Sequence, residues 1–411
     1  MIPILDPGIK METGYHVYDE GIIKKIFCKN PQGKEFVGFV WPGATVFPDF
    51  SIQEGRNWWS EHAETFLKNG FRGVWIDMND PSLGSGEPES MLFNQGNDSH
   101  DSFHNQYAMG MAQATFSAFI KKAPDKRPFV LSRSGSPGIN RYAALWTGDN
   151  FSNLHHLRSS IPISLNLALS GVPFNGPDIA GFGGNASGSL MSLWIKCAFL
   201  FPFLRNHSVK GSCEQEPWQY PRPVRNIIRH YIQMRYKLLP YLYNLFIQHE
   251  KTGSAILRPL FYDFKDDKKS EYSLVGDQFM VGPSILQAPI LDDIKNERIA
   301  LIPTGFWYSV SQSKWIAGGK NMKLNTGPTE TPLFIRDGSI IPMQKGIRSH
   351  HFNDLAHIEF HVFLSEKNQK TIEYQYYYDD GESFDYKKGN EGLIELKLTL
   401  RNKRTYGLYK I

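Results

Sequence analysis

Two acidic residues at the ends of apolar runs are the side chains of this sequence best placed to do chemistry. Asp77 ends the run at residues 73–76, and Asp149 follows a similar run at residues 142–146. Barrel strands present reactive groups at their C-terminal ends in this way. Two carboxyl groups about 5 Å apart are the minimum set of catalytic groups for cleaving a glycosidic bond with retention of configuration. The two run ends therefore predict a pair of catalytic carboxylates.

Each acidic residue has a plainer interpretation when it is taken alone. Asp77 equally fits a residue that caps the following helix, and Gly148-Asp149-Asn150 is an ordinary turn composition. The combination favours catalysis, because the separation of 72 residues (149 − 77) leaves room for about two strand–helix units of a barrel. Both side chains would then face the same end of that barrel.

Polar and aromatic residues at other expected strand ends complete a candidate pocket. Arg133 would keep a carboxylate ionised or bind a hydroxyl group, and Asp178 and His207 suit the recognition of neighbouring hydroxyl groups. A lone histidine is more often structural, so His207 keeps that alternative. Trp41 fits a pocket wall and a packed core equally well.

The composition is that of a globular protein. The chain has 411 residues, of which 41% are hydrophobic and 21% charged, and this length fits about two or three domains. The net charge of +4 is spread along the chain, and the densest positive stretch, residues 222–237, has the pattern of an amphipathic helix. We therefore expect no nucleic-acid partner. The sequence shows no run typical of a membrane span, so no membrane partner is expected either.

The three cysteines carry little information about a site. Cys28, Cys197 and Cys213 are scattered, show no metal-binding spacing and leave one cysteine over from any pair. We therefore expect no metal ion. A reducing compartment, the cytoplasm, is the expected location.

Strand-like and helix-like segments alternate from residue 1 to about residue 265, which predicts an α/β fold with a parallel sheet or barrel. Strands are expected at residues 2–6, 73–77, 128–133, 142–149, 172–178 and 198–207. Helices are expected at residues 57–69, 109–119 and 223–248, where apolar residues recur at spacings of three and four. Residues 8–50 are rich in Gly, Pro and aromatic residues, and we interpret them as a long excursion without a helix.

After about residue 270 the pattern changes to strands separated by turn residues, which is typical of an all-β region. The expected strands are residues 275–286, 304–310, 332–343 and 371–378. Asp379-Asp380-Gly381 predicts a hairpin turn rather than a metal site. The predicted domains are a barrel domain at residues 1–265 with its insertion at about 8–50, a proximal β-sandwich at 266–345 and a distal β-domain at 346–411.

Taken in order, these strand ends resemble those of glycoside hydrolase family 31, the α-glucosidase family. Trp75-Ile76-Asp77-Met78-Asn79 is similar to the family's nucleophile motif, and Leu145-Trp146-Thr147-Gly148-Asp149-Asn150 is similar to its acid/base motif. Further segments match in order: Asp6-Pro7-Gly8-Ile9, Val40-Trp41-Pro42-Gly43, Phe47-Pro48-Asp49-Phe50, Leu131-Ser132-Arg133-Ser134, Gly176-Pro177-Asp178-Ile179-Ala180-Gly181-Phe182, Arg205-Asn206-His207 and, for the distal domain, Tyr378-Asp379-Asp380-Gly381. The resemblance covers essentially the whole chain.

This resemblance implies a retaining α-glucosidase, a hydrolase of carbohydrate metabolism that needs no cofactor. It would remove terminal non-reducing α-linked glucose from maltose, oligosaccharides or other α-glucosides by double displacement through a covalent glycosyl-enzyme. Asp77 would be the nucleophile and Asp149 the acid/base. The implied substrate-binding residues are Ile4, Trp41, Trp75, Met78, Arg133, Trp146, Asp178, Phe182 and His207.

The resemblance also implies that part of the family's fold is not represented. Residues 2–6 resemble the family's third barrel strand, so the first two strands and the N-terminal β-sandwich are missing from the match. The expected fold is therefore an incomplete (β/α)8 TIM barrel followed by C-terminal all-β sandwich domains, with open sheet edges and exposed apolar surface. The alternative to an active hydrolase is a catalytically inactive carbohydrate-binding fragment, or a subunit that needs a separate N-terminal chain.

Overall fold

The computed structural model describes residues 2–264, 270–292, 296–347, 354–367, 371–401 and 404–410. The chain divides into two compact units. The first consists of Met1–Trp146 with Glu382–Phe384, and the second of Thr147–Gly381 with Asp385–Ile411. Within the described ranges, no helix is both long and apolar enough to cross a membrane.

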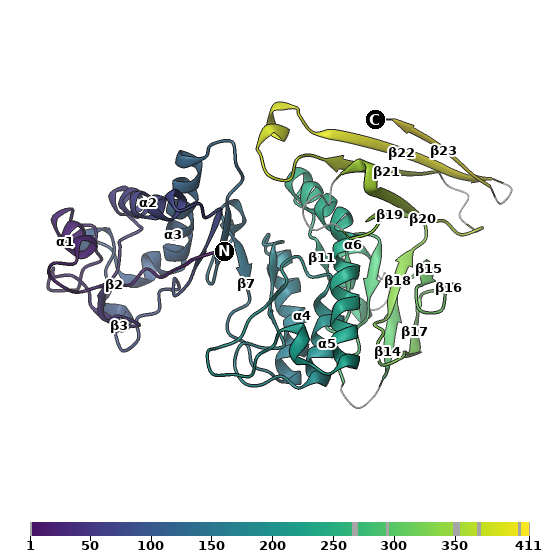
Figure 1. Cartoon of the computed structure of the whole chain (residues 1–411), viewed down its shortest axis with the longest axis horizontal. Helices are drawn as coiled ribbons and strands as arrows, with labels where there is room; N and C mark the ends of the chain where they lie inside the picture. Colours follow the sequence, from purple (N-terminus) through teal and green to yellow (C-terminus); the bar gives the residue numbers. More distant parts are fainter. Residues whose placement is uncertain are drawn as a thin grey trace. The chain divides into compact units, whose positions relative to one another are not determined.

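Four parallel strands form the centre of the first unit (Figure 1). Their order is β1 (Ile4–Leu5), β5 (Gly73–Ile76), β6 (Phe129–Ser132) and β7 (Ala144–Trp146). Leu5 is in register with Ile76, and Ile76 with Ser132, so the first three strands end at the same level. Helices α2 (Gln53–Lys68) and α3 (His100–Lys122) pack together, and Trp59 donates a hydrogen bond of 2.8 Å to Thr115 between them.

The excursion between β1 and α2 contains a helix, so the expectation of none at residues 8–50 is wrong. Helix α1 spans His16–Ile23 and buries only Gly21, where an added Cβ would lie 2.2 Å from the Phe27 ring. A helix with one buried position has almost no apolar periodicity, which is why the sequence pattern does not reveal it. The antiparallel strands of this excursion are β2 (Ile9–Lys10), β3 (Gly38–Val40) and β4 (Gly43–Val46).

The second unit begins with short strands and three helices, coloured teal in Figure 1. The strands are β8 (Asn175–Gly176), β9 (Asp178–Ile179) and β10 (Arg205–Asn206), and β9 and β10 are parallel. The helices are α4 (Leu154–Leu169), α5 (Gly188–Ala198) and α6 (Arg222–Thr252). The predicted helices at 57–69, 109–119 and 223–248 are thus confirmed as parts of α2, α3 and α6.

The strand expected at residues 198–207 is wrong over most of its length. Ala198 ends α5, and only Arg205–Asn206 forms a strand. Phe199, Leu200 and Phe201 are completely buried at the end of the helix. An apolar run buried on all sides has no period, so its pattern cannot distinguish a helix end from a buried strand.

Antiparallel sheets follow, which confirms the all-β pattern expected after residue 270. A short helix, α7 (Leu260–Asp263), lies near their start. The main sheet has the order β11 (Leu257–Arg258), β12 (Phe279–Val281), β13 (Ile285–Gln287), β18 (Leu333–Arg336), β15 (Phe306–Ser309) and β16 (Lys314–Ala317). The smaller sheets pair β14 (Glu297–Ile302) with β17 (Lys320–Asn325), β19 (Ser339–Gln344) with β20 (Ile358–Phe363), and β21 (Thr371–Tyr378), β22 (Gly392–Arg401) and β23 (Arg404–Lys410) in order.

Helix α6 is attached to β21 by a buried amide. Asn244 is 1% exposed, donates to the carbonyl of Gln375 and accepts from the backbone of Tyr377, both at 3.0 Å. Beyond β21, Asp379 accepts from the backbone of Gly381 at 2.8 Å, which forms the expected turn. That turn opens a longer connection to β22 rather than a tight hairpin, because β22 begins only at Gly392.

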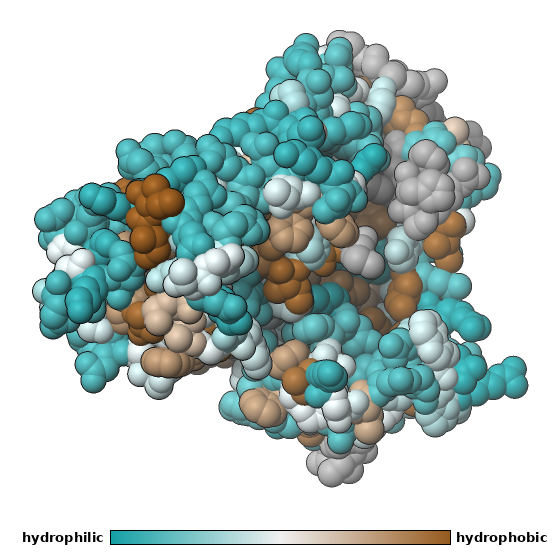
Figure 2. Space-filling view, turned by 60° about the vertical axis from the view of Figure 1, so that its left-hand side comes forward, coloured by the Kyte–Doolittle hydropathy of each residue, from teal (hydrophilic) through white to brown (hydrophobic). Residues whose placement is uncertain are grey.

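The parallel strands do not close into a barrel. Strand β1 stands at one end of its strand order, and β10 stands at the end of its pair with β9. Such edges carry backbone groups that can pair with another strand. Figure 2 shows a mainly hydrophilic surface interrupted by separate groups of apolar side chains. At the β1 edge of the first unit, Ile2 and Ile4 are 45% and 52% exposed.

Candidate active site

Asp77 lies directly beyond the end of β5 in a tightly fixed backbone. Its N–H donates to the carbonyl of Leu5 at 3.0 Å, which continues the pairing with β1. Its Oδ1 accepts from the backbone N–H of Met78 at 2.8 Å. Met78 has a φ of 55°, a left-handed conformation that is unfavourable for a residue with a long side chain. Strain of this kind persists only where the surroundings hold the chain in place.

The side chain that holds this loop is Asn79. It is fully buried, donates to Ser132 Oγ at 2.9 Å and accepts from the backbone N–H of Ser134 at 3.1 Å. Both partners follow or end β6, the neighbouring strand. The loop after Asp77 is therefore fastened to the end of β6, which fixes the direction of the Asp77 carboxylate.

Arg133 is the cation of this strand end. Its backbone N–H donates to the carbonyl of Ile76 at 3.2 Å, and its Nη1 lies 3.2 Å from Asp77 Oδ1. Its Nε and Nη2 donate to Asp80 Oδ1 at 2.9 and 2.6 Å. The side chain is 19% exposed, so water screens these contacts only partly. Arg133 therefore favours an ionised Asp77, as a nucleophilic carboxylate requires.

Aromatic and apolar residues flank the carboxylate on the same strands. The ring centroids of Trp75 and Trp146 lie 5.0 Å apart with an interplanar angle of 86°, and Trp146 is only 2% exposed. Ile4 is in register with Trp75 and is half exposed. Trp41 lies in the turn between β3 and β4 with 82% of its surface exposed, so it is not a core residue.

Asp149, in the second unit, is exposed and follows a glycine that turns the chain. Gly148 has a φ of 84°, which suits glycine far better than other residues. The next residue, Asn150, is 8% exposed and donates to the carbonyl of Asp178 at 2.9 Å. Its side chain accepts from the backbone N–H of Phe182 at 3.0 Å. The backbone beside Asp149 is thus hydrogen-bonded to the loop that carries Asp178 and Phe182, two other predicted site residues.

That loop is built around a buried ion pair. Asp178 is fully buried, and Arg205 donates to its two oxygens from Nε at 2.5 Å and from Nη2 at 3.2 Å. Gly181 has a φ of 97°, and an added Cβ would lie 2.4 Å from the backbone nitrogen of Ser152. Only glycine fits there, and this close approach places the Phe182 ring in a stack with His207, at 5.2 Å and 23°.

The structure shows charged residues that the sequence pattern does not single out. Arg205 is the partner of Asp178, and Asp80 is the second partner of Arg133. The third such charged residue is Asp6, which lies directly beyond the end of β1. Burial and, to a smaller extent, the charge of Asp77 together raise the pKa of Asp6 to about 6, and Arg133 opposes the shift. Asp6 follows Leu5 as Asp77 follows Ile76, so the same rule would have found it.

The predicted site residues fall into two groups. Ile4, Trp41, Trp75, Asp77, Met78, Arg133 and Trp146 belong to the first unit, and Asp149, Asp178, Phe182 and His207 belong to the second. The convergence of the two carboxylates on one sugar stays a prediction. Within the described part of the chain, no group of three His, Cys, Asp or Glu side chains is arranged to hold a metal ion.

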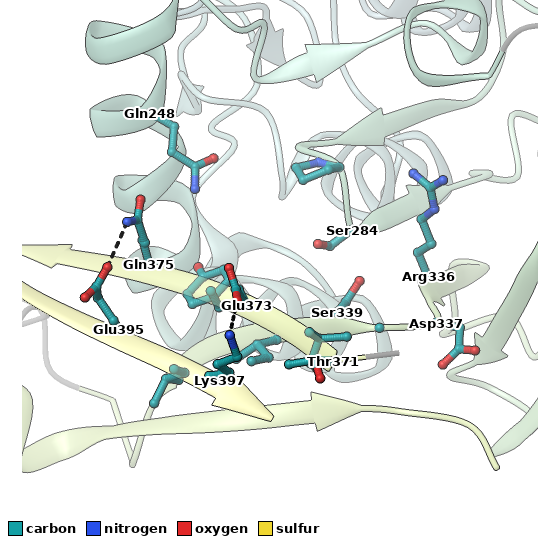
Figure 3. A pocket seen from close by; sticks show the side chains of 16 residues that line it. Gln248, Ser284, Arg336, Asp337, Ser339, Thr371, Glu373, Gln375, Glu395 and Lys397 are labelled. Carbon is teal, nitrogen blue, oxygen red and sulfur yellow. Dashed lines mark hydrogen bonds and ion pairs between the residues drawn. The ribbon is translucent and has the colours of Figure 1, made fainter. Parts of the chain in front are cut away.

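A cavity of about 1020 Å³ lies elsewhere in the second unit, among α6, β21 and β22 and the turns that precede β13 and β19 (Figure 3). None of the predicted site residues lines it. Its acidic side chains are engaged across the strands, with Lys397 2.7 Å from Glu373 and Gln375 donating to Glu395 at 3.1 Å. The residues predicted to be catalytic follow the ends of β5 and β7 and lie outside this cavity.

Comparisons with known proteins match most of the chain to one family. A family model described as the glycosyl hydrolases family 31 TIM-barrel domain matches residues 1–245, and the family's C-terminal domain matches residues 253–341. "Alpha-glucosidase 2" of Bacillus thermoamyloliquefaciens is 39% identical over 396 residues, which are 95% of this chain and 50% of that protein. This chain therefore spans about half the length of that curated relative.

Two solved structures show the same architecture. The family 31 α-glucosidase of Bacteroides thetaiotaomicron matches with a TM-score of 0.83 and 33% identity, over 99% of this chain and 64% of that one. A Flavobacterium johnsoniae family 31 dextranase, complexed with glucose, matches with a TM-score of 0.90 and 26% identity, over 98% and 51%. The predicted fold class, an incomplete TIM barrel followed by β domains, is confirmed.

The buried pair of Asp178 and Arg205 leads to a prediction about stability. Asp178→Asn should lower the free energy of unfolding by about 3–5 kcal/mol, because it leaves a mostly buried guanidinium group without its counter-charge. The double variant Asp178→Leu with Arg205→Met should recover most of that loss. Urea unfolding followed by circular dichroism measures both. Glu373→Gln, which removes an exposed ion pair, is the control and should change little. Equal losses in the single and double variants would contradict the prediction.

Proposed function

Because the chain belongs to glycoside hydrolase family 31, we propose that it carries the catalytic machinery of a retaining α-glucosidase. The observation that supports this most is the fixed Asp77 carboxylate, 3.2 Å from the guanidinium group of Arg133 at a parallel strand end. An ionised carboxylate beside a cation, held by a strained and hydrogen-bonded loop, is suited to attack an electrophilic carbon.

The proposed reaction has two steps. First, an oxygen of Asp77 forms a bond to the anomeric carbon as the bond from that carbon to the leaving oxygen breaks. The bonding electron pair stays on the leaving oxygen, which takes a proton from the Asp149 carboxyl group. Then Asp149, now ionised, takes a proton from water, whose oxygen displaces Asp77 from the anomeric carbon. The sugar leaves with its original configuration and both carboxyl groups regain their starting states.

The proposed substrate is an α-glucoside with a terminal non-reducing glucose, such as maltose or a short oligosaccharide. The relatives that support this are named as α-glucosidases, and one dextranase structure is complexed with glucose. Trp75, Phe182 and His207 offer ring faces for a sugar, and Trp146 is the proposed pocket residue that packs against Trp75. Ile4, Trp41, Met78, Arg133 and Asp178 are the other proposed pocket residues. No step of the proposed reaction uses a cofactor.

Replacement of the nucleophile gives the first test of this function. Asp77→Asn keeps the size and most hydrogen bonds of the side chain but removes the charge that attacks. Release of the aryl group from an aryl α-glucoside should fall to below roughly a thousandth of the wild-type rate. Asp101→Asn, which removes an exposed charge from the start of α3, is the matched control and should retain activity. Undiminished turnover by Asp77→Asn would refute the assignment.

A second test addresses the acid/base. Asp149→Ala should slow substrates with poor leaving groups, such as maltose, much more than aryl α-glucosides with acidic leaving groups, because only the former need a proton at once. Azide should restore part of the rate on the aryl substrate by replacing water without needing a general base, and should release an α-glucosyl azide. Product analysis by NMR identifies that compound. If azide restores nothing and both substrates slow equally, Asp149 has another role.

A second candidate function is supported by the open sheet edge. The chain spans about half of its relatives' length, and β10 stands at the end of its strand pair. Beside β10 lies an apolar groove of about 490 Å³, lined by Met191, Ile195, Leu204, Ile228, Ile232 and Leu239. A strand and an amphipathic helix from a separate N-terminal chain would fit such an edge and groove. The protein would then be an inactive carbohydrate-binding subunit until that chain binds.

The two candidates predict different behaviour of the purified chain. If the subunit function holds, hydrolysis of an aryl α-glucoside should appear only when the N-terminal half of the Bacillus relative is added. Ile232→Asp and Leu239→Asp, which place charge in the groove, should then abolish the hydrolysis gained on addition of the N-terminal half. Leu169→Asp, at an exposed position on α4, is the control and should not. Full activity of the chain alone would reject this candidate and support the autonomous enzyme.

We also propose a reducing location, the cytoplasm, for the protein. Cys28 and Cys197 are buried and Cys213 is exposed, and all three carry free thiols. Burial raises the pKa of the Cys197 thiol to about 12, so it is a structural side chain rather than a nucleophile. Labelling of Cys213 by a maleimide in protein freshly isolated from its cells would support this location.

A further inference from the structure

Three charged residues occupy one row across the ends of three neighbouring strands. Leu5, Ile76 and Ser132 are in register, so the next residues, Asp6, Asp77 and Arg133, stand at the same level of β1, β5 and β6. The backbone pairing continues through this row, because Asp77 N–H donates to Leu5 and Arg133 N–H to Ile76. Neighbouring strands lie about 4.8 Å apart, and residues at one level of a parallel sheet point to the same face. Asp77 therefore has a carboxylate on one side and a guanidinium group on the other.

Asp6 is not neutralised as Asp77 is. Among the described residues, the side chain of Arg133 contacts Asp77, Asp80, Ser82 and Met78 but not Asp6. Asp6 Oδ1 is buried and has no hydrogen-bond partner among the described residues. Burial, together with a smaller contribution from the charge of Asp77, raises the pKa of Asp6 to about 6 although Arg133 acts in the opposite direction. Among the described residues, the charged groups that act on Asp6 are Asp77 from β5 and Arg133 from β6.

We propose that Asp6 is a positioning residue for the nucleophile: its carboxylate repels that of Asp77 and so favours the step in which Asp77 loses its charge. This inference rests on the proposed glycosidase function. When Asp77 forms an ester with the anomeric carbon, one of the two neighbouring negative charges disappears, and the repulsion between them is relieved. The ground state with two charges is thereby raised relative to the glycosyl-enzyme. Asp6 itself makes and breaks no bond.

The same repulsion makes the two carboxyl groups titrate as a coupled pair. Below about pH 6 Asp6 takes up a proton and the repulsion is lost, so the free enzyme should lose activity as Asp6 becomes neutral. The decrease of kcat/KM toward acidic pH, the acidic limb of its pH profile, would then reflect protonation of the Asp6–Asp77 pair rather than of Asp77 alone. An ester at Asp77 would in turn make Asp6 a stronger acid, because the neighbouring charge is gone.

The kinetic experiment uses Asp6→Asn, which keeps the shape of the side chain and removes its charge. We expect the acidic limb of kcat/KM for an aryl α-glucoside to move to lower pH by about one unit, and the value above pH 7 to fall roughly tenfold. Asp101→Asn, which removes an exposed charge in the same unit, should change neither. An unchanged limb in an active Asp6→Asn enzyme overturns the inference and leaves the proposed function standing. A wild-type protein without glycosidase activity in any preparation overturns both.

A stability measurement tests whether ionised Asp6 is unfavourable in the fold. The folded protein binds the Asp6 proton more tightly than an unfolded chain, whose ordinary Asp pKa is 3.8, so the ionised residue costs stability as the pH rises from about 3.8 to about 6. Asp6→Asn should therefore raise the unfolding temperature, and by more at pH 7.5 than at pH 5. A lower unfolding temperature at pH 7.5 would contradict an unpartnered charge at this position.

A third measurement needs no Asp6 variant. Carbon-13 NMR of protein labelled at aspartate carboxyl groups should show one residue that titrates near pH 6. In Asp77→Asn this midpoint should fall, because the neighbouring charge has been removed while burial is kept. The same midpoint in both proteins would mean that the two carboxylates do not interact, and the inference would be wrong.

Discussion

The guanidinium group of Arg133 is the interaction on which the nucleophile side of the candidate site depends. It lies 3.2 Å from Asp77 and donates two hydrogen bonds to Asp80, so one cation serves two carboxylates of a single loop. If either Asp77 or Asp80 were removed, the other carboxylate would interact with the Arg133 guanidinium group alone. A lysine could not replace it, because a single ammonium group cannot bind at both places with the fixed directions of a guanidinium fork.

The backbone makes this arrangement rigid before any substrate arrives. Met78 adopts a left-handed conformation, and Asn79 is buried with both ends of its amide bonded to residues at the end of β6. The cost of that conformation is offset by the hydrogen bonds of Asn79 and the strand pairing of Asp77. An enzyme gains from such arrangement because no reorganisation is then needed as the reaction proceeds. The second unit uses the same device at Ala180 and Gly181, beside the buried pair of Asp178 and Arg205.

The sequence predicts those parts of the molecule whose pattern has a period or a sharp end. Helix α6 has a clear apolar stripe, and Asp77 follows a short apolar run at once, so both are found. Helix α1 buries one residue and has no stripe, and residues 198–201 are buried on all sides, so neither pattern can identify the local structure.

The sequence also does not reveal which charged residues pair with one another, and the reason is different. The sequence indicates that Asp178 ends a strand, but it does not show that Arg205 occupies both of its oxygens. That knowledge needs the register between β9 and β10, which pairs residues 27 positions apart. Asp6 was within reach of the strand-end rule, yet its lack of a cation appears only when the contacts of Arg133 are known.

The two carboxylates of the proposed reaction are supported by separate sets of contacts. Asp77 and Asp149 belong to different units, whereas retaining hydrolysis requires their carboxyl groups to lie about 5 Å apart on one sugar. The Asp77 carboxylate is held by Arg133 and the strand pairing, whereas the hydrogen bonds of Asn150 fix the backbone beside Asp149. The proposed mechanism therefore makes a strict demand on the carboxyl separation, since a small error in it costs far more rate than it costs folding free energy.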